Sequence, residues 1–389
     1  MKNKTRSRIR NLLVFCLTVG GIVGILAYPE ISCDAAEKGI EISLSVLIPT
    51  LFPFLVLSGV FIKFGFAEKL GRLAGGFTKK IFCVGGNCSC AMVLGLISGF
   101  PVGAKTVATL YKDGACTKTD AERTLAFCNN AGPSFILGTV GVGIWQSGKT
   151  GWLLWGVQVI SSVLVGVCVG RIWKGTDTES PVSKTEKFEK AEKKTFLRIF
   201  LTSVTDGAVS VLYICAFVIF FAVVVSLLLH TGIIPLTAGF LCKLFPFFDR
   251  EAVENVLVGV FEMTTGVGRI GSSAPILQNL ALTSAVIGWA GISVHCQVLS
   301  YICDGGLSPK PYFLGKVLQT AFATALTFAF SFLFSDSSVE TAFLSEKLRE
   351  VPFEILVFGF VVVASAVVLV LLVRDSKQTE KTVKFSQKP

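Results

Sequence analysis

The sequence predicts an all-α polytopic membrane protein with about eight transmembrane helices and two re-entrant hairpins, arranged as two inverted repeats. Three observations support this prediction. Of the 389 residues, 52% are hydrophobic and only 16% are charged, whereas a soluble domain carries about 25% charged residues. The apolar residues form long runs rather than amphipathic periods, as membrane-spanning helices do. Two apolar segments in corresponding places of the two halves are interrupted by glycine and polar residues, a pattern typical of transporter binding sites.

The charge and cysteine content argue against two classes of site. The net charge of +10 comes mainly from the two tails and a few connecting segments. The sequence shows no basic face on a folded domain, so it does not predict nucleic-acid binding. Most of the twelve cysteines lie inside apolar runs, where a thiol behaves as a small hydrophobic group. Cys83, Cys88 and Cys90 form one cluster, but the second Cys or His pair of a metal site is missing. We therefore expect no metal and no cofactor.

Residues 1–41 are predicted to form a cytoplasmic N-terminus, a first span and an outer loop. Basic residues precede an apolar run at 11–28. This run resembles a signal peptide, but Leu26-Ala27-Tyr28-Pro29 lacks an A-x-A-like cleavage site, which favours an uncleaved span. The acidic segment 29–41 suits the outside, because positively charged loops stay in the cytoplasm.

Residues 42–171 are predicted to form the first repeat. Its expected elements are a span at 42–62, a hairpin at 81–111, and spans at 124–145 and 151–171. Pro49 and Pro53 should kink the first of these spans. The hairpin must return to the cytoplasm, because a full crossing would place the lysine-rich linker at 172–208 outside, against the positive-inside tendency.

Residues 209–334 are predicted to form the second repeat. Its expected elements are a span at 209–229, a hairpin at 255–275 that enters from outside, and spans at 280–303 and 312–334. Residues 335–389 then supply an outer loop, a last span at 352–373 and a basic cytoplasmic tail. Eight spans place both termini in the cytoplasm and the protein in the cell membrane.

Glycine positions support an internal duplication. They are Gly65, Gly95 and Gly132 in the first half and Gly232, Gly259 and Gly291 in the second. The intervals between them are 30 and 37 residues against 27 and 32. Ala131-Gly132-Pro133-Ser134 also corresponds to Ala290-Gly291-Ile292-Ser293. Glycine-rich membrane helices can align by chance, but spacing, local sequence and loop charge agree, which favours inverted repeats around a midplane site.

Glu262 is the strongest candidate for a functional residue. It lies in an apolar segment beside Thr264 and Thr265, where a charge is costly unless it is paired or hydrated. Its carboxylate can bind a solute hydroxyl or amine, a Na⁺ ion or a proton. The structural alternative is an ion pair with Arg269 near the membrane surface, and we favour the functional interpretation.

The first half contributes polar residues at the hairpin tip and at an expected interruption of span three. They are Ser98, Gly99, Pro101, Asn129, Asn130 and Ser134. The Ser98 hydroxyl and the backbone freed around Gly99 and Pro101 are expected to line the tip. Asn129 and Asn130 offer donors and acceptors to a polar solute, but they suit hydrogen bonding between helices equally well. Both interpretations stay open.

The second half offers Ser293, His295 and Gln297 near Gly291. A single membrane histidine is more often a hydrogen-bonding group between helices than a proton relay, and we favour the former role for His295. The sequence contains no P-loop, no dinucleotide fingerprint, no HExxH motif and no convincing nucleophile–base set. It therefore does not predict an enzyme.

Four segments carry a resemblance to a known family. They are Leu47-Ile48-Pro49-Thr50-Leu51-Phe52-Pro53-Phe54, Ser98-Gly99-Phe100-Pro101-Val102-Gly103-Ala104-Lys105, Phe127-Cys128-Asn129-Asn130-Ala131-Gly132-Pro133-Ser134-Phe135 and Glu262-Met263-Thr264-Thr265-Gly266. They resemble the YlbJ-type sporulation integral membrane proteins over roughly residues 10–335. These belong to a wider group with the nucleoside-recognition or Gate domain, which includes concentrative nucleoside transporters and the membrane part of ferrous-iron transporters. The resemblance implies spore cortex formation in endospore-forming Firmicutes and a transporter-like fold, but it supplies neither a substrate nor catalytic residues.

Two hypotheses follow for the function. The first is a permease for a small polar solute of unknown identity, which works by alternating access of the two repeats and uses Na⁺ or H⁺ as coupling ion. The second is a non-transporting scaffold or assembly factor for sporulation that retains a transporter fold. In both hypotheses the lipid bilayer surrounds the protein, and oligomerisation is left open.

Overall fold

The computed structural model describes residues 2–173, 196–246, 249–272 and 277–334. Every regular element in these residues is a helix, which confirms the predicted all-α class. The elements of the first half are α1 (Lys2–Ala27), α2 (Pro29–Ile42), the π-helix η1 (Ser43–Leu47), α3 (Ile48–Lys63), α4 (Phe66–Phe82), the 3₁₀ turn η2 (Gly86–Cys88), α5 (Ser89–Ser98), α6 (Val102–Lys112), α7 (Lys118–Leu125), the π-helix η3 (Ser134–Ile144) and α8 (Gly148–Ile172). Those of the second half are α9 (Phe196–His230), α10 (Ile233–Leu244), α11 (Arg250–Phe261), α12 (Met263–Ser272), α13 (Leu277–Trp289), α14 (Gly291–Asp304) and α15 (Lys310–Phe334).

Several of these helices are long and apolar enough to cross a membrane. Among the described residues they are Pro29–Phe61, Gly148–Ile172, Phe196–His230, Leu277–Asp304 and Lys310–Phe330. The predicted span at 11–28 lies in the shorter apolar helix Asn11–Ala27, and the one at 352–373 lies outside the described residues. The membrane class is therefore confirmed, whereas the number of eight spans stays a prediction.

The N-terminal third departs from the predicted organisation. Residues 29–41 were expected to form an outer loop, but they form α2, which begins with Pro29 in the first turn, a position that suits proline. Its acidic residues recur at helical spacing and are all exposed; they are Glu30, Asp34, Glu37 and Glu41. The short π-helix η1 joins α2 to α3 just before Pro49. Such a bulge accommodates the missing N–H of a proline within a long helix.

The linker predicted at 172–208 is shorter than expected. Helix α9 begins at Phe196 and contains 35 residues, so the expected boundary at 209 is wrong. The reason is visible in the sequence, because Phe196-Leu197-Arg198-Ile199-Phe200-Leu201 is largely apolar and continues the helix toward its N-terminus.

The two predicted hairpins have the expected helix–break–helix form. In the first, Gly99-Phe100-Pro101 separates α5 from α6, which pack against each other. In the second, Glu262 alone separates α11 from α12. The first hairpin is shorter than predicted, because α4 extends to Phe82. Span three is interrupted as predicted, since no helix covers residues 126–132, between α7 and η3.

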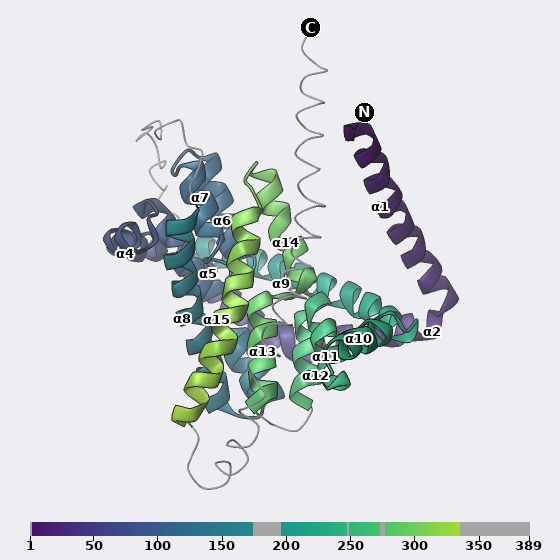
Figure 1. Ribbon diagram of the computed structural model, residues 1–389. Coiled ribbons are helices and arrows are strands. Elements are labelled where there is room, and N and C mark those ends of the chain that lie inside the picture. The colour runs from purple at the N-terminus through teal and green to yellow at the C-terminus, as the bar shows by residue number, and fades with distance from the viewer. Residues whose placement is uncertain (1, 174–195, 247–248, 273–276, 335–389) are drawn as a thin grey trace.

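The same order of elements occurs in both halves. A long helix (α3 or α9) is followed by a glycine with positive φ, Gly65 at 76° or Gly232 at 79°, which directly precedes the next helix. A short helix (α4 or α10) follows, then a hairpin (α5–α6 or α11–α12), an interrupted span (α7–η3 or α13–α14) and a last helix (α8 or α15). The order supports a duplication. In Figure 1, α6 and α7 lie toward the top of the molecule and α12 and α13 toward the bottom. The inverted arrangement of the two repeats stays a prediction.

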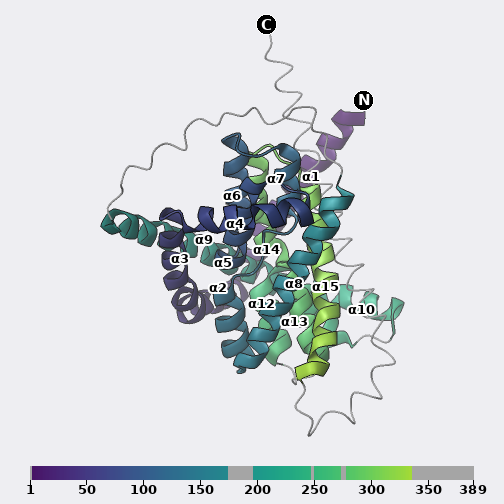
Figure 2. The same cartoon turned by 90° about the vertical axis from the view of Figure 1, so that its left-hand side faces the viewer.

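Two sets of helices hold the hairpins in place. The last helices of the two halves, α8 and α15, run side by side, with α13 packed against α15 (Figure 2). Helix α9 packs against both α2 and α3.

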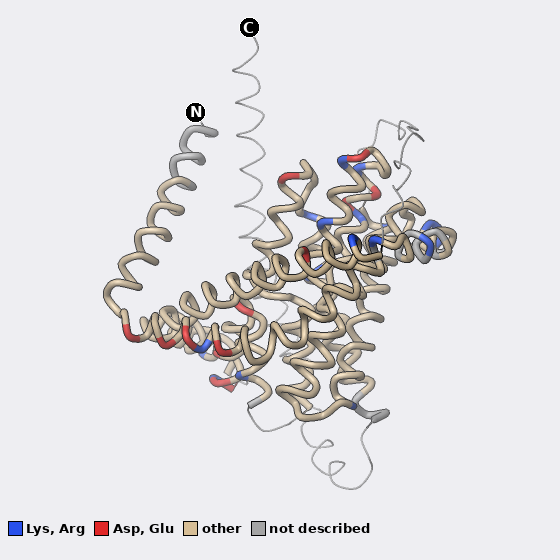
Figure 3. The backbone as a smooth tube through the Cα atoms, turned by 180° about the vertical axis from the view of Figure 1, so that it is seen from behind, with Lys and Arg blue, Asp and Glu red and all other residues tan. Residues whose placement is uncertain are grey.

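Lys and Arg gather at the end that carries α4, α6 and α7, whereas the acidic residues of α2 lie on the opposite side (Figure 3). This distribution agrees with the predicted cytoplasmic side at the α4 end.

Candidate functional site

A cavity of about 60 Å³ lies where the interruptions of the helices meet. Its walls come from the tip of the first hairpin, the interruption of span three, the second hairpin and α14, together with apolar residues of η1, α3, η3 and α9. The polar or backbone-exposing lining residues are Ser98, Gly99, Gly132, Glu262, Thr264, Ser293 and Gln297, and the apolar ones include Leu51, Phe100, Phe135 and Met263. Six predicted site residues, Ser98, Gly99, Glu262, Thr264, Ser293 and Gln297, are thus brought to one cavity from both halves of the chain.

Close backbone contacts build this cavity at two corresponding places. Gly99 has a φ of +76°, and a Cβ there would lie 2.6 Å from the backbone N of Gly132. Gly291 has a φ of +79°, and a Cβ there would lie 2.9 Å from the backbone N of Met263. In each half the glycine at the interruption of the span, Gly132 or Gly291, therefore meets the break of its own hairpin, as the paired glycine positions in the sequence suggested. Only glycine fits both the conformation and the space.

Glu262 is buried and is held at the start of α12. Its side chain is 1% exposed. Its carboxylate oxygens accept hydrogen bonds from the backbone N–H of Thr264 at 3.0 Å and of Thr265 at 2.6 Å. The two bonds satisfy N–H groups of the first turn of α12, which lack intrahelical partners. Arg269, the alternative partner considered for Glu262, donates from Nε to Asn255 Oδ1 at 2.8 Å.

Ser98 connects the cavity to a larger space. Its side chain is 7% exposed, and its Oγ has no hydrogen-bond partner within the described part of the chain. The residue lines both the cavity and a vestibule of about 920 Å³. Because a buried hydroxyl is usually paired, an unpaired one facing a cavity indicates a place for water or a ligand.

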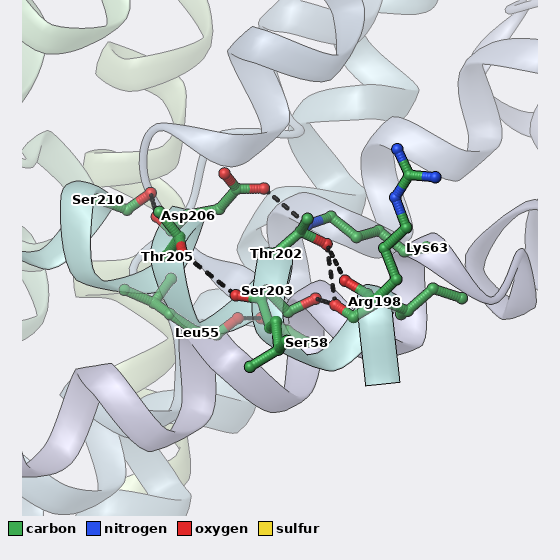
Figure 4. A network of polar contacts seen from close by, with 11 residues as sticks. Leu55, Ser58, Lys63, Arg198, Thr202, Ser203, Thr205, Asp206 and Ser210 are labelled. Carbon is green, nitrogen blue, oxygen red and sulfur yellow. Dashed lines mark hydrogen bonds and ion pairs between the residues drawn. The ribbon is translucent and has the colours of Figure 1, made fainter. Parts of the chain in front are cut away.

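The vestibule extends along α6 toward the basic end of the molecule. It is bounded by α3, α5, α6 and α9 and includes Pro101, Lys105 and Asp113. At its edge the Lys63 Nζ lies 2.7 Å from Asp206 Oδ2, an ion pair that joins α3 to α9 (Figure 4). Both side chains are partly exposed, at 29% and 69%, so the pair contributes at most about 1 kcal/mol of stability.

A buried polar network lies behind the cavity and was not predicted from the sequence. Gln319 Nε2 donates to Asn130 Oδ1 at 2.7 Å and to Gln158 Oε1 at 3.2 Å. Gln158 Nε2 donates to the backbone O of Ser284 at 2.9 Å. Asn130 Nδ2 donates to Ser162 Oγ at 3.2 Å. These bonds link the interruption of span three to α8, α13 and α15. The only sequence signal was the presence of single polar residues within apolar spans.

The remaining predicted residues lie around the cavity rather than in it. Asn129 Oδ1 accepts from the backbone N–H of Ala104 at 2.8 Å, in the first turn of α6. His295 is fully buried, and its Nδ1 lies 2.7 Å from the Tyr312 hydroxyl, a contact between α14 and α15. Ser134 starts η3 and Thr265 lies in the first turn of α12. Within the described ranges no group of three or more His, Cys, Asp or Glu could hold a metal ion.

Comparison with known proteins agrees with the resemblance found in the sequence. Residues 44–144 match the model of the Gate family, which is described as nucleoside recognition. This match begins in η1 and ends in η3, so it contains the first hairpin and the interruption of span three. The chain is also 27% identical over 333 residues to the sporulation integral membrane protein YlbJ of Bacillus subtilis (strain 168), with 82% of each chain covered. No solved structure matches.

Proposed function

We propose that this chain is a permease for a small polar solute and works by alternating access around the cavity between the two hairpins. One observation carries the proposal. Two helix breaks, far apart in the sequence, meet in one cavity with a buried carboxylate and a hydroxyl that has no hydrogen-bond partner among the described residues. In membrane proteins, irregular backbone at depth is tolerated where it is enclosed by protein or lines a cavity, and an ionisable residue there marks a solute or ion pathway.

The two spaces suit different occupants. The cavity has room for an ion or a few water molecules, since one water needs about 10–15 Å³ of such space. Among the described residues its lining contains one carboxylate and no Lys, Arg or His, so it favours Na⁺ or a proton at Glu262 over an anion. The vestibule has the size of a small-molecule site, about 300–1,000 Å³. We infer that a solute enters through the vestibule and reaches Ser98.

The comparisons and the charge distribution suggest the setting. A Bacillus subtilis relative is named as a sporulation integral membrane protein, and we propose that this chain also acts in spore formation, specifically of the cortex. The basic end of the molecule then faces the cytoplasm, with both termini on that side of the cell membrane. In this orientation the structure corresponds to a state whose vestibule opens to the cytoplasm.

Cysteine labelling tests the vestibule and its orientation. Ser98→Cys, in a protein whose exposed or vestibule-lining cysteines Cys16, Cys83, Cys90 and Cys303 are replaced by serine, is expected to react with a membrane-impermeant maleimide from the cytoplasmic side only. The native Cys33, exposed on α2, is retained as an internal control and should react from the outside. Labelling of both thiols from one side would contradict the topology. Failure of the introduced thiol to react from either side would contradict an open vestibule.

The alternative is a scaffold that keeps the fold without transport. Uptake into proteoliposomes, measured over a panel of sugars, amino acids, nucleosides and small amines, distinguishes the two functions. A permease gives saturable uptake of at least one solute, lost in Glu262→Gln. A scaffold gives none, and its sporulation phenotype tolerates Glu262→Gln but not changes in the loops or tails.

A further inference from the structure

A fully buried lysine lies next to the interruption of span three. Lys316, on α15, is 0% exposed. Its Nζ donates to the backbone O of Asn129 and to Gln319 Oε1 at 2.9 Å. It also lies 4.8 Å from the centroid of the Phe100 ring. The ammonium group therefore touches the interrupted span and the tip of the first hairpin at once.

The surroundings of this ammonium group differ from those of an ordinary buried lysine. Such a charge is normally paired with a carboxylate. Here, among the residues that the structure describes, both hydrogen-bond acceptors of Lys316 are neutral oxygens, and the third contact is the face of an aromatic ring. A peptide oxygen, an amide oxygen and an aromatic face are the groups that hold a small monovalent cation.

The geometry explains why a cation belongs at this place. Residues 126–132 lack helical structure, so the carbonyl of Asn129 has no helical N–H partner and accepts from Lys316 Nζ instead. The side chain of the same residue accepts from Ala104 N in the first turn of α6. Asn129 thus lies between the hairpin and α15. The hydrogen bond from Lys316 to its carbonyl connects the first half of the chain to the second.

We propose that the Asn129 carbonyl, Gln319 and Phe100 form a binding site for a monovalent ammonium-type cation, and that the Lys316 side chain is its permanent occupant. Lys316 acts as a positioning residue, because it fixes the interrupted span against the first hairpin without entering the cavity lining. This site does not depend on transport. It would exist equally in a scaffold.

Chemical rescue tests the proposal. Lys316→Ala empties the site, and its melting temperature in detergent is expected to fall by several degrees. Methylammonium chloride should restore at least half of this loss in a dose-dependent manner, compared with choline chloride at the same ionic strength. Lys316→Met fills the space without a charge, so it should also melt lower than the wild type and should not respond. Lys105→Ala, in the vestibule, is the control and should respond like the wild-type protein.

Three results would overturn the proposal. They are a methylammonium effect of equal size in all variants, no effect on Lys316→Ala, and a wild-type melting temperature for Lys316→Met. If Lys316→Ala fails to accumulate, Lys316→Met decides, because it keeps most of the volume of the side chain while it removes the ammonium group and its hydrogen bonds. Failure of the permease hypothesis would give a different result. The wild-type protein would then show no solute uptake, while methylammonium would still restore the melting temperature of Lys316→Ala.

Discussion

Glu262→Gln is expected to reduce solute uptake by about 10- to 100-fold while the protein still inserts and accumulates. The change keeps the shape of the side chain and removes its charge. A hydrogen bond to a charged group contributes about 1.5–3 kcal/mol, and about 1.4 kcal/mol corresponds to a factor of ten in binding. The loss of the charged acceptor in the cavity should therefore appear in the binding of the solute or coupling ion.

A stability effect must be separated from this functional effect. The carboxylate accepts from two backbone N–H groups, of Thr264 and Thr265, and a glutamine has one carbonyl oxygen to offer them. We expect Glu262→Gln to lower the free energy of unfolding by about 1–2 kcal/mol, because one buried N–H loses its partner. Uptake should therefore be measured per folded protein, as judged by a monodisperse elution profile in detergent.

A matched control lies on the same hairpin. Glu254, on α11, is paired with Arg250 at 3.1 Å, and its side chain is 20% exposed. Glu254→Gln removes the same charge outside the cavity, so it should leave uptake unchanged and alter stability by at most about 0.5 kcal/mol. Equal losses in both variants would indicate a general effect of charge. Normal uptake in Glu262→Gln would refute the role of this residue.

Sequence reasoning located the two breaks because their cause is local. Glycine and proline close together within a long apolar run disfavour a continuous helix, so Gly99, Pro101 and the segment around Glu262 were recognisable. A buried acid beside such a break was then the natural candidate. The same reasoning missed α2, because the net acidic charge of residues 29–41 is also typical of an outer loop. Their helical spacing was the available signal, since exposed residues on one face recur every three or four positions.

The buried network could not be predicted for a different reason. Gln158 and Gln319 are 161 residues apart in the sequence and hydrogen-bond only because α8 and α15 pack together. A single polar residue in an apolar span does not reveal its partner. The structure also shows the Asn130 side chain hydrogen-bonded within the protein. Asn130→Ala would therefore disturb this network and is a poorer test of solute binding than Glu262→Gln.

Gly95→Ala is expected to have the largest effect on stability. A Cβ on Gly95 would lie 1.6 Å from the backbone O of Cys128, and one on Gly103 would lie 2.2 Å from the same atom. Both arms of the first hairpin thus close on one carbonyl of the interrupted span. Backbone atoms cannot turn aside as a flexible side chain can. The added methyl group must push the hairpin away from the span, at a cost of about 3 kcal/mol or more.

The expected result is little or no folded protein, measured by its accumulation in membranes and by its melting temperature in detergent. Gly156→Ala is the control, because Gly156 also lies in an apolar helix, α8, and its Cβ would have no atom within 4 Å. That change should be neutral or slightly stabilising, since alanine favours the helix over glycine by about 1 kcal/mol. If Gly95→Ala accumulates and melts like Gly156→Ala, the hairpin does not pack on the interrupted span as described, and the cavity between them loses its wall.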